Sequence, residues 1–598
     1  MESSKQHIQY VALFVAVFSM SGVAVWLTLS RPATGYEVSI YAQYSPLFWV
    51  LLCGALIMAA TSLFLSTYTN SYRWKSLAII LATYSMFLAI PDIRGYALYG
   101  RISDLQQHIG WTKAVFETGE LTIYPGFHFL MAILNLFGVP FQNLRLIFAI
   151  LPLSLWIVGI GLYTRRVTNS KTAATFAIFT AIPLALGEFH LQFQPAVKSF
   201  LVFPIAFVAI EEYANTSDRS ALGLSLVFIS GFVLLHPISG LLFATAVSVS
   251  AFASNVALNG QKYHEYPFLP AVAGSISIVM WLLYHGRGAK SISSVFIGAL
   301  GSAGETAVKE SASSSAGNGI VNMVLSYIGD VSLTTSQLAI RFFELYGVTV
   351  GFLLLAGFAS LWAGLDWIMN RNRHWPGLHM NTQFVVGGVV AVAFLLLPLI
   401  VGSPVRVSRY VVLFGSILLG IWLWRTKSSN PGSHYREVAM VAIAVIVLLV
   451  LIPAGVMTSY EDNSHLTHSE EEGIQFVIEY HNSEKGVTTF LMDQRQVSYL
   501  AGSTYANRQW LFNRRAPTKP KGFPDHLGYP EQRVGDWIGS GYLITKQVDT
   551  RFVEYYFDSQ RDRLTYYTED DQERIESDRT VNSVYTNGNF TVWVVRND

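Results

Sequence analysis

The stretch "GRISDLQQHIGWTKAVFETGELTIYPGFHFL", which runs from Gly100 to Leu130, decides how the chain is interpreted. It carries one aspartate, two histidines, one arginine, one lysine, two glutamates and a Tyr-Pro pair. The flanking sequence is mainly apolar, in runs of the length that crosses a lipid bilayer. Charged groups are costly inside the hydrocarbon region. We therefore place this stretch in a loop at a membrane surface.

The composition supports a polytopic α-helical membrane protein. Of the 598 residues, 52% are hydrophobic and only 13% are charged, whereas soluble proteins average about 25% charged residues. The formal net charge of +1 argues against a nucleic-acid partner recruited by bulk charge. The single cysteine, Cys53, excludes a disulfide framework or a multi-cysteine metal site within the chain.

Hydropathy predicts about 13 transmembrane helices within residues 1–457, which we treat as one domain. Two longer intervals are expected to be extracytoplasmic loops, at 92–142 and 285–340. The expected helices lie near 8–30, 46–67, 76–91, 143–164, 172–188, 197–213, 221–235, 239–257, 267–284, 341–366, 383–402, 407–425 and 437–457.

Basic residues beside short loops predict the orientation in the membrane. With a cytoplasmic N-terminus, one group falls inside: Arg73, Lys75, Arg165, Arg166, Lys171, Arg219, Lys262, Arg371, Arg373, Arg425, Lys427 and Arg436. A smaller group falls outside: Arg94, Arg101, Lys113, Lys198, Arg406 and Arg409. An odd number of helices then places the C-terminal part outside the cytoplasm.

Residues 458–598 are expected to form a separate α/β domain. Hydropathy falls after Val456, and residues 459–598 contain 22 Asp and Glu against 15 Lys and Arg. "GVTTFLM", "GYLITK" and "VNSVYTNGNFTVWVV" are typical of strands, the last with an Asn-Gly turn. "EEEGIQFVIEYHN" has helical spacing. Asn589 begins a sequence of the glycosylation-acceptor form.

The polar stretch itself predicts two short helices. Residues 105–120 have amphipathic spacing and would lie at the membrane interface. The apolar surface of this helix would consist of Leu105, Ile109, Trp111, Val115 and Phe116. The run "GFHFLMAILNLFG", at 126–138, is too short to span a bilayer, so we expect a half-buried or re-entrant element.

Two acids near this surface are candidates for a catalytic base. Asp92 follows Pro91 at the end of an expected helix, and Asp104 precedes His108 by four residues, on the same helix face. A carboxylate in such a position can accept a proton from a hydroxyl group. Asp104 also fits an N-cap of the helix that follows, and His108 also fits an ordinary interfacial polar residue.

The order of residues in this loop resembles that of the first extracytoplasmic loop of GT-C glycosyltransferases. The matching positions are Asp104, His108, Gly119, Tyr124-Pro125, Phe137-Gly138 and Arg145-Leu146. The resemblance covers residues 92–166, and the remainder of the chain matches only in architecture. It implies a GT-C-like fold with Asp104 as the catalytic acid or base. The second acid often found beside it is absent, since Leu105 stands there, and Asp92 remains the competing candidate.

The resemblance implies a donor, an acceptor and a reaction. The donor would be a polyprenyl (dolichyl) phosphate sugar, and archaeal dolichyl-phosphate-mannose mannosyltransferases of S-layer N-glycosylation are the best analogy. The acceptor would be a glycan or glycoprotein at the outer membrane face. A lipid-linked glycan flippase or exporter and an oligosaccharide transferase are the alternatives. A WWDYG-type motif, expected for an oligosaccharyltransferase, is absent from the sequence.

Other polar residues near the same face are expected to contact the substrates. Arg406 and Arg409 share a helix face, and arginine matches phosphate oxygens bidentately. We therefore expect them to bind the lipid phosphate. Ordinary flanking of a helix is the alternative for both. The candidates for substrate binding are Arg101, His108, Tyr124, Lys198 and His236. The sequence contains no tight carboxylate–histidine cluster, so we predict no metal ligands, although some relatives use a divalent cation.

Overall fold

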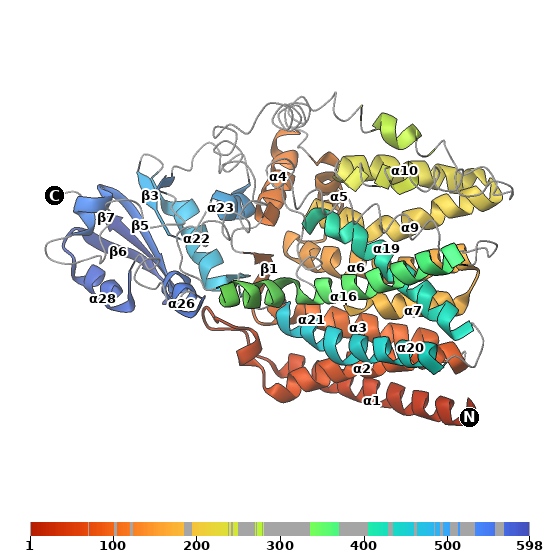
Figure 1. The fold of residues 1–598 in the computed structure, drawn as a ribbon. Helices are drawn as coiled ribbons and strands as arrows, with labels where there is room; N and C mark the ends of the chain where they lie inside the picture. Colours follow the sequence, from red (N-terminus) through yellow and green to blue (C-terminus); the bar gives the residue numbers. More distant parts are fainter. Residues whose placement is uncertain are drawn as a thin grey trace.

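A computed structural model describes most of the chain, and it forms a helical bundle with a sheet domain at one end (Figure 1). The described residues are 2–69, 71–100, 104–119, 124–183, 194–236, 335–369, 405–428, 434–459, 463, 465–482, 485–490, 494–502, 512–514, 533–556 and 567–596, with short pieces of 239–279. The long helices of the bundle are α1 Glu2–Leu29, α2 Pro46–Thr69, α3 Arg73–Ile93, α6 Phe141–Thr168, α9 Pro195–Thr216, α10 Arg219–Leu235, α16 Thr335–Met369 and α19 Val405–Ser428.

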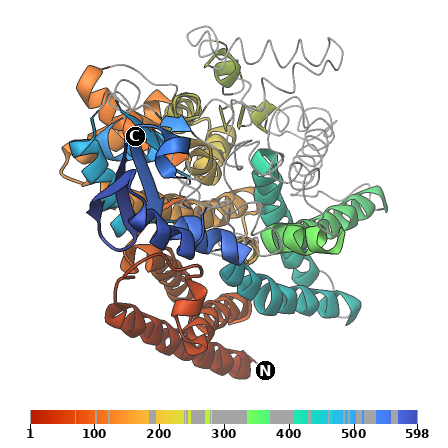
Figure 2. The same cartoon turned by 90° about the vertical axis from the view of Figure 1, so that its left-hand side faces the viewer.

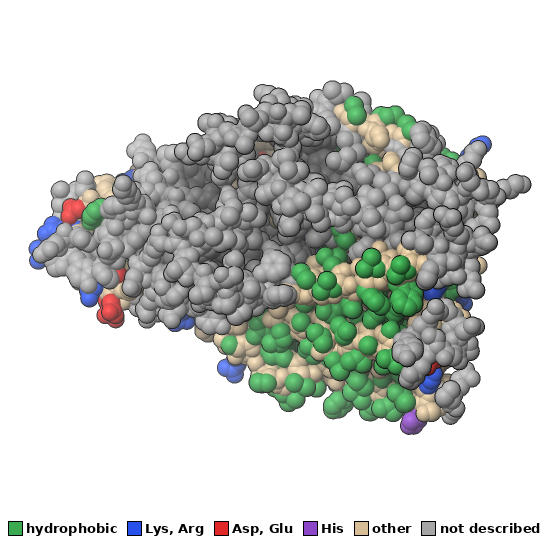
Figure 3. Space-filling view, viewed as in Figure 1, with side chains coloured by type: hydrophobic (Ala, Val, Ile, Leu, Met, Phe, Trp, Pro, Cys, Tyr) green, Lys and Arg blue, Asp and Glu red, His purple; other side chains and the backbone are tan. Residues whose placement is uncertain are grey.

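The bundle confirms a polytopic α-helical membrane protein. Within the described residues, seven helices are long and apolar enough to cross a bilayer. Their outer faces are apolar: Phe18 of α1 is 68% exposed and Leu361 of α16 is 72% exposed. Figure 3 shows a continuous hydrophobic surface on this side of the bundle. Such a surface is typical of contact with lipid.

The expected number of 13 spans is not confirmed. The expected helix at 383–402 lies outside the described residues, as do most of those at 239–257 and 267–284. The expected helix at 172–188 is described as α7, Lys171–Ala181. The last span is composite, with α20 His434–Ile446, the π-helical turn η3 Val447–Leu451 and α21 Ile452–Thr458 in sequence. The second expected loop is described only where α16 begins, at Thr335.

Short polar caps produce the tight turns between successive helices. Asn169 ends α6 with a φ of 50°, and Ser170 then caps α7 by accepting a hydrogen bond from the Ala173 N–H. Ser217 has a φ of 55° at the end of α9, and Asp218 caps α10 in the same way. A left-handed residue followed by a hydroxyl or carboxylate cap reverses the chain within two residues.

Basic residues gather at the end of the bundle that carries these turns. The Lys427 ammonium interacts as a like charge with Lys5 and Arg73. Arg166, at the end of α6, forms an ion pair with Glu212 of α9 at 3.0 Å. Four of the residues that the basic-residue pattern assigns to the cytoplasmic side, Arg73, Arg165, Arg166 and Lys427, therefore lie at one end of the bundle.

The C-terminal α/β domain contains the expected strands and helix. Its five-stranded sheet has the order β4-β3-β5-β7-β6. β3 pairs in parallel with β4 and β5, whereas β7 is antiparallel to β5 and β6. The strands are β3 Gly486–Thr488, β4 Phe512–Arg514, β5 Gly541–Lys546, β6 Val581–Thr586 and β7 Phe590–Val595. The helices are α22 His468–Tyr480, α23 Gln494–Ala501, α25 Val534–Ile538, α26 Gln547–Tyr556 and α28 Glu569–Ser577.

The first loop and the C-terminal domain are joined by strand pairing. β1, Tyr96–Gly100, pairs antiparallel with β2, His465–Thr467. Figure 2, viewed from this end, shows the C-terminal domain beside the first-loop helices. The C-terminal domain and the first loop therefore lie at the same end of the bundle, opposite the basic cluster.

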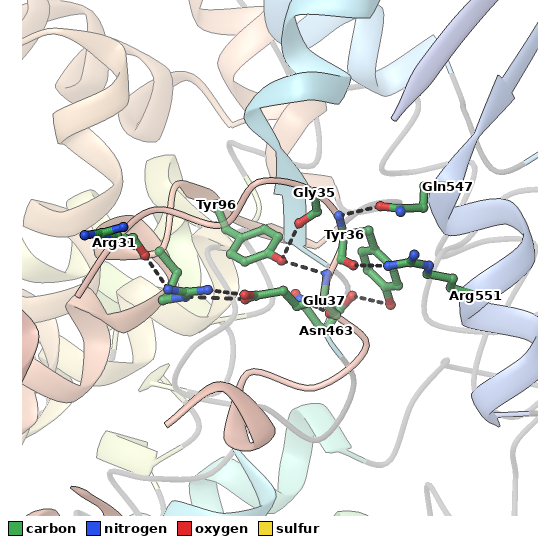
Figure 4. A network of polar contacts seen from close by, with 9 residues as sticks. Arg31, Gly35, Tyr36, Glu37, Tyr96, Asn463, Gln547 and Arg551 are labelled. Carbon is green, nitrogen blue, oxygen red and sulfur yellow. Dashed lines mark hydrogen bonds and ion pairs between the residues drawn. The ribbon is translucent and has the colours of Figure 1, made fainter. Parts of the chain in front are cut away.

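The segment between α1 and α2 fastens this junction (Figure 4). Glu37 forms an ion pair with Arg94, and its main-chain N–H donates to the Tyr96 hydroxyl at 2.9 Å. The Tyr36 hydroxyl donates to the Asn463 carbonyl at 3.1 Å, and the Tyr36 N–H donates to the Gln547 side chain at 3.0 Å. The segment between α1 and α2 thereby connects the end of α3, Asn463 before β2 and the start of α26.

The segment between α1 and α2 also accepts a hydrogen bond from Asn589, the asparagine of the glycosylation-acceptor sequence. Asn589 Nδ2 donates to the Thr34 carbonyl at 2.7 Å, and the next hydroxyl residue, Thr591, is buried. The same nitrogen also donates to the Ser469 Oγ at 3.3 Å. A glycan would remove one of the two N–H groups and hence one of these hydrogen bonds, so the fold disfavours glycosylation at Asn589.

Candidate functional site

The first-loop helix α4, Asp104–Thr118, is packed between α5 and the C-terminal domain. Ile109 is fully buried in a core shared with α22, β3 and β7. The prediction that Ile109 belongs to a lipid-facing surface is therefore wrong, because α23 covers that side of α4. Gly110 permits the contact, since a Cβ atom there would come within 2.6 Å of the Ser498 carbonyl oxygen. Phe116 is exposed, and Trp111 and Val115 are partly buried.

α5, Pro125–Leu136, is the half-buried element expected at 126–138. Phe127, His128 and Met131 are buried, whereas Ile133 is 47% exposed and Leu136 is 74% exposed. Pro125 stands in the first helical turn, where a missing N–H leaves no hydrogen bond unmade. α5 therefore presents an apolar face outward and a histidine inward.

Two buried histidines meet between α4 and α5. His108 Nδ1 lies 3.0 Å from His128 Nε2, so one ring donates to the other. His128 is 0% exposed, and burial lowers its pKa to about 3. It is therefore neutral at physiological pH, and the pair is linked by one shared proton.

A second group of polar residues continues from the histidine pair. The Tyr124 ring lies 5.5 Å from the His108 ring and 5.1 Å from the His236 ring, measured between centroids. His236 stands at the C-terminal end of α10, where its Nδ1 is 3.3 Å from the Ser239 Oγ. Ser239 and Ser199 are joined through their hydroxyl groups at 2.8 Å.

Two buried cations lie at the end of this chain of contacts. Lys198 precedes Ser199 in the first turn of α9 and is 4% exposed, and Arg409 of α19 is 5% exposed. The two groups interact as like charges. Their charges add to a locally positive site on the first-loop side of the bundle, and anions bind at such sites.

The structure therefore brings five of the expected site residues into one region: His108, Tyr124, Lys198, His236 and Arg409. Arg101 and the side chains of Asp104 and Arg406 lie outside the described residues. Along the backbone, Asp104 is the first residue of α4, one turn before His108, and Arg406 lies one turn before Arg409 in α19. Asp92 is half-buried in the last turn of α3, where its main-chain carbonyl accepts from the Gly95 N–H.

Sequence analysis missed three members of this region: His128, Ser199 and Ser239. His128 stands alone in an apolar run, which gave the only signal, because a buried polar group in such a run needs a partner. The sequence around Ser199 and Ser239 contained no such signal. In the described part of the chain, no three His, Cys, Asp or Glu side chains are grouped as metal ligands.

Comparisons with known proteins found similarity only among solved structures. No protein-family model and no curated protein matches the chain. The oligosaccharyltransferase of Archaeoglobus fulgidus, in its apo form, has 13% identity over 88% of this chain and 75% of its own, with a TM-score of 0.45. The same values of identity and coverage, with a TM-score of 0.44, hold for AglB from that organism in complex with an inhibitory peptide and a dolichol-phosphate.

A second kind of enzyme is similar to the same extent. ArnT from Cupriavidus metallidurans bound to undecaprenyl phosphate has 11% identity over 88% of this chain and 98% of its own, with a TM-score of 0.43. At these values the likenesses do not assign a function, which must come from the residues of the site.

Proposed function

We propose that this chain is a GT-C-type membrane glycosyltransferase that uses a polyprenyl-phosphate sugar as its donor. The observation that carries the proposal is that Lys198 and Arg409 are both buried and interact with each other. A series of contacts connects them to His108 of α4. A positive site at the end of an apolar bundle suits a phosphate carried on a lipid tail. The motif order of the first loop, which resembles that of GT-C enzymes, supports the same function.

In the proposed reaction, Lys198 and Arg409 hold the donor phosphate, together with Arg406 one turn away. Asp104 accepts the proton of an acceptor hydroxyl, with Asp92 as the alternative base. The hydroxyl oxygen forms a bond to the anomeric carbon, and the bond between that carbon and the phosphate oxygen breaks. Polyprenyl phosphate leaves with the electron pair and needs little help from an acid. Direct displacement inverts the anomeric centre.

His108 and His128 would serve the acceptor side of the site. The neutral His128 cannot act as a cation, but its hydrogen bond fixes the orientation and tautomer of His108. His108 stands one turn after Asp104 on the same helix face. We assign His108, Tyr124 and His236 to the binding of sugar hydroxyl groups between the base and the phosphate. Arg101 stays a candidate for the same role.

The proposed site faces the outside of the cell. The basic cluster at the opposite end of the bundle is the cytoplasmic side by the positive-inside rule. The C-terminal domain would then be extracytoplasmic and the acceptor a glycan or glycoprotein at the outer face. Mannose is the first sugar to test. The motif order does not require a metal, and a divalent cation is to be tested by adding a chelator.

The decisive experiment compares two conservative variants in one transfer assay. Asp104→Asn should reduce transfer from a dolichyl- or undecaprenyl-phosphate sugar about 10²–10⁴-fold, because it removes the base. Asp92→Asn should leave most of the activity. The opposite result would make Asp92 the base, and full activity in both variants would refute the mechanism. Membrane insertion of each variant is the control.

Analysis of glycans from a deletion strain separates this function from its alternatives. Loss of one terminal sugar indicates a monosaccharide transferase. A complete lipid-linked glycan that is never transferred indicates an oligosaccharide transferase or a flippase. A flippase would also be expected to carry charges near the middle of the bilayer, whereas Lys198 and Arg409 stand near helix ends.

A further inference from the structure

Three aromatic rings form a ladder at one edge of the C-terminal domain. Phe476 of α22 is stacked on Tyr585 of β6, with ring centroids 4.4 Å apart and an interplanar angle of 21°. Tyr480, one helical turn further along α22, lies 4.9 Å from Phe476 at an angle of 31°. Tyr480 is 68% exposed, and the other two rings are partly exposed. Tyr480 is therefore the ring most accessible to a ligand, and Phe476 and Tyr585 support it from beneath.

Tight packing beneath the ladder holds the rings in place. Gly473 lies against the Phe590 ring so closely that a Cβ atom would come within 2.2 Å of it. This contact seats α22 on β7 and sets Phe476 over Tyr585. The Tyr585 hydroxyl accepts a hydrogen bond from Asn587 Nδ2 at 3.2 Å. A ligand would meet rings that are already ordered, which reduces the entropy lost on binding.

A carboxylate borders the ladder. Glu472 is exposed and precedes Phe476 by one turn, so it shares a face with Phe476 and Tyr480. Its negative charge acts on Tyr585. A carboxylate accepts hydrogen bonds from hydroxyl groups and repels phosphates, sulfates and acidic sugars. The ladder therefore favours a ligand that has hydroxyl groups and no negative charge.

We propose that Glu472, Phe476, Tyr480 and Tyr585 bind a neutral pyranose unit of a glycan chain. One face of a pyranose ring carries C–H groups, which pack on the negative face of an aromatic ring. The hydroxyl groups at the edge of the sugar then reach Glu472. The inference rests on the proposed glycosyltransferase function, because it identifies this ligand as part of the acceptor. The C-terminal domain would hold the glycan while its end enters the site in the bundle.

The test uses the full chain in nanodiscs and ligand-observed saturation-transfer NMR. The probes are mannotriose, maltotriose and galactotriose, with a sulfated disaccharide as the charged comparison. Tyr480→Ala should weaken binding of at least one neutral probe by about fivefold or more, because one stacked ring is lost. Tyr480→Phe should bind normally, since it keeps the ring. Val584→Ala is the matched control, because Val584 is 46% exposed and adjoins Tyr585.

The outcomes separate this site from the proposed reaction. Neutral probes that bind the wild type and Tyr480→Ala equally, or that fail to bind the wild type, overturn the glycan site and leave the transfer assay untouched. Tighter binding of the sulfated probe also overturns it. Ring-dependent binding in a chain that shows no sugar transfer supports the glycan site and refutes the proposed reaction. Tyr480→Ala should keep the wild-type melting temperature, since the ring is mostly exposed.

Discussion

Two buried lysines in this molecule are surrounded in opposite ways. Lys546 of the C-terminal domain is 2% exposed and lies 3.6 Å from Asp549 and 3.9 Å from Glu470. Lys198 of the bundle is 4% exposed and interacts with another cation, Arg409. Burial of a charge is costly unless it is compensated. The first lysine lies beside two carboxylates of its own domain, and the second lies in a positive site that we propose binds a phosphate.

The network around Lys546 is therefore structural. The Tyr567 hydroxyl lies 3.0 Å from Asp549, and burial raises the pKa of Tyr567 well above its usual value, so the phenol stays protonated. Glu470 also belongs to the capping box that begins α22. One buried cation thus connects α22, β5 and α26, and no further chemistry is needed to explain it.

The largest effect is expected from Lys546→Met. The substitution leaves two buried carboxylates beside an apolar side chain, which should destabilise the domain by about 3–5 kcal/mol. Proteolysis of the C-terminal domain as a function of temperature measures the change. Lys485→Met, at an exposed lysine, is the control. Adding Asp549→Asn and Glu470→Gln should recover part of the loss, and an unchanged melting temperature in Lys546→Met would refute the structural role.

Lys198→Met is expected to affect ligand binding more than stability, unlike Lys546→Met. Removing one of two like charges should lower the melting temperature less than Lys546→Met does, while binding of undecaprenyl monophosphate falls about 10–100-fold. Arg409→Met should act in the same direction. Binding is measured by native mass spectrometry in nanodiscs, with undecaprenol as the uncharged probe. Lys171→Met, at an exposed residue of α7, is the control. Unfolding of Lys198→Met would show that Lys198 is structural like Lys546.

His128 is a third buried basic residue, and it differs from both lysines because burial keeps its imidazole neutral. Its pKa is about 3 in the folded state and about 6.5 in an unfolded chain. Between these values the unfolded state binds the proton and the folded state does not, so stability falls as the pH is lowered from about 6.5. The slope is about 1.4 kcal/mol per pH unit. Melting temperatures from pH 7 to pH 4.5 should show this slope, and His128→Gln should flatten it. An equal slope in both proteins would contradict the prediction.

The elements that depend on local pattern could be predicted from the sequence. Apolar runs predicted helices of the bundle, and strand-type residues on both sides of an Asn-Gly turn predicted β6 and β7 at 581–595. Polar residues near the expected outer face were predicted as site residues, and five of them, His108, Tyr124, Lys198, His236 and Arg409, lie in one region. The helices and strands depend on residues close together in the chain.

Contacts between distant segments could not be predicted. Ile109 has the spacing of an interfacial residue, and only the position of α23, almost 400 residues later, shows that it is buried. For Lys198 the sequence placed a polar side chain near the outer face, but not the arginine beside it. Pairing of this kind depends on how helices pack, which no single-sequence pattern encodes.

Lys113 provides the smallest and most discriminating test of the comparison. It is partly buried, and its Nζ donates to the Tyr499 and Leu500 carbonyls at 2.8 and 2.7 Å. These carbonyls end α23, where the helix dipole is negative. Backbone carbonyls and the single carboxylate of Glu117 thus compensate Lys113, whereas two carboxylates compensate Lys546. Lys113→Met should lower stability by about 1 kcal/mol, or about 2–4 °C in melting temperature, because the carbonyls can still bind water. Lys113→Arg should restore most of it. If Lys113→Met lowers stability as much as Lys546→Met does, the carbonyls at the end of α23 stabilise a buried lysine as strongly as two carboxylates do. Such a loss would also mean that α4 and α23 unfold as one unit.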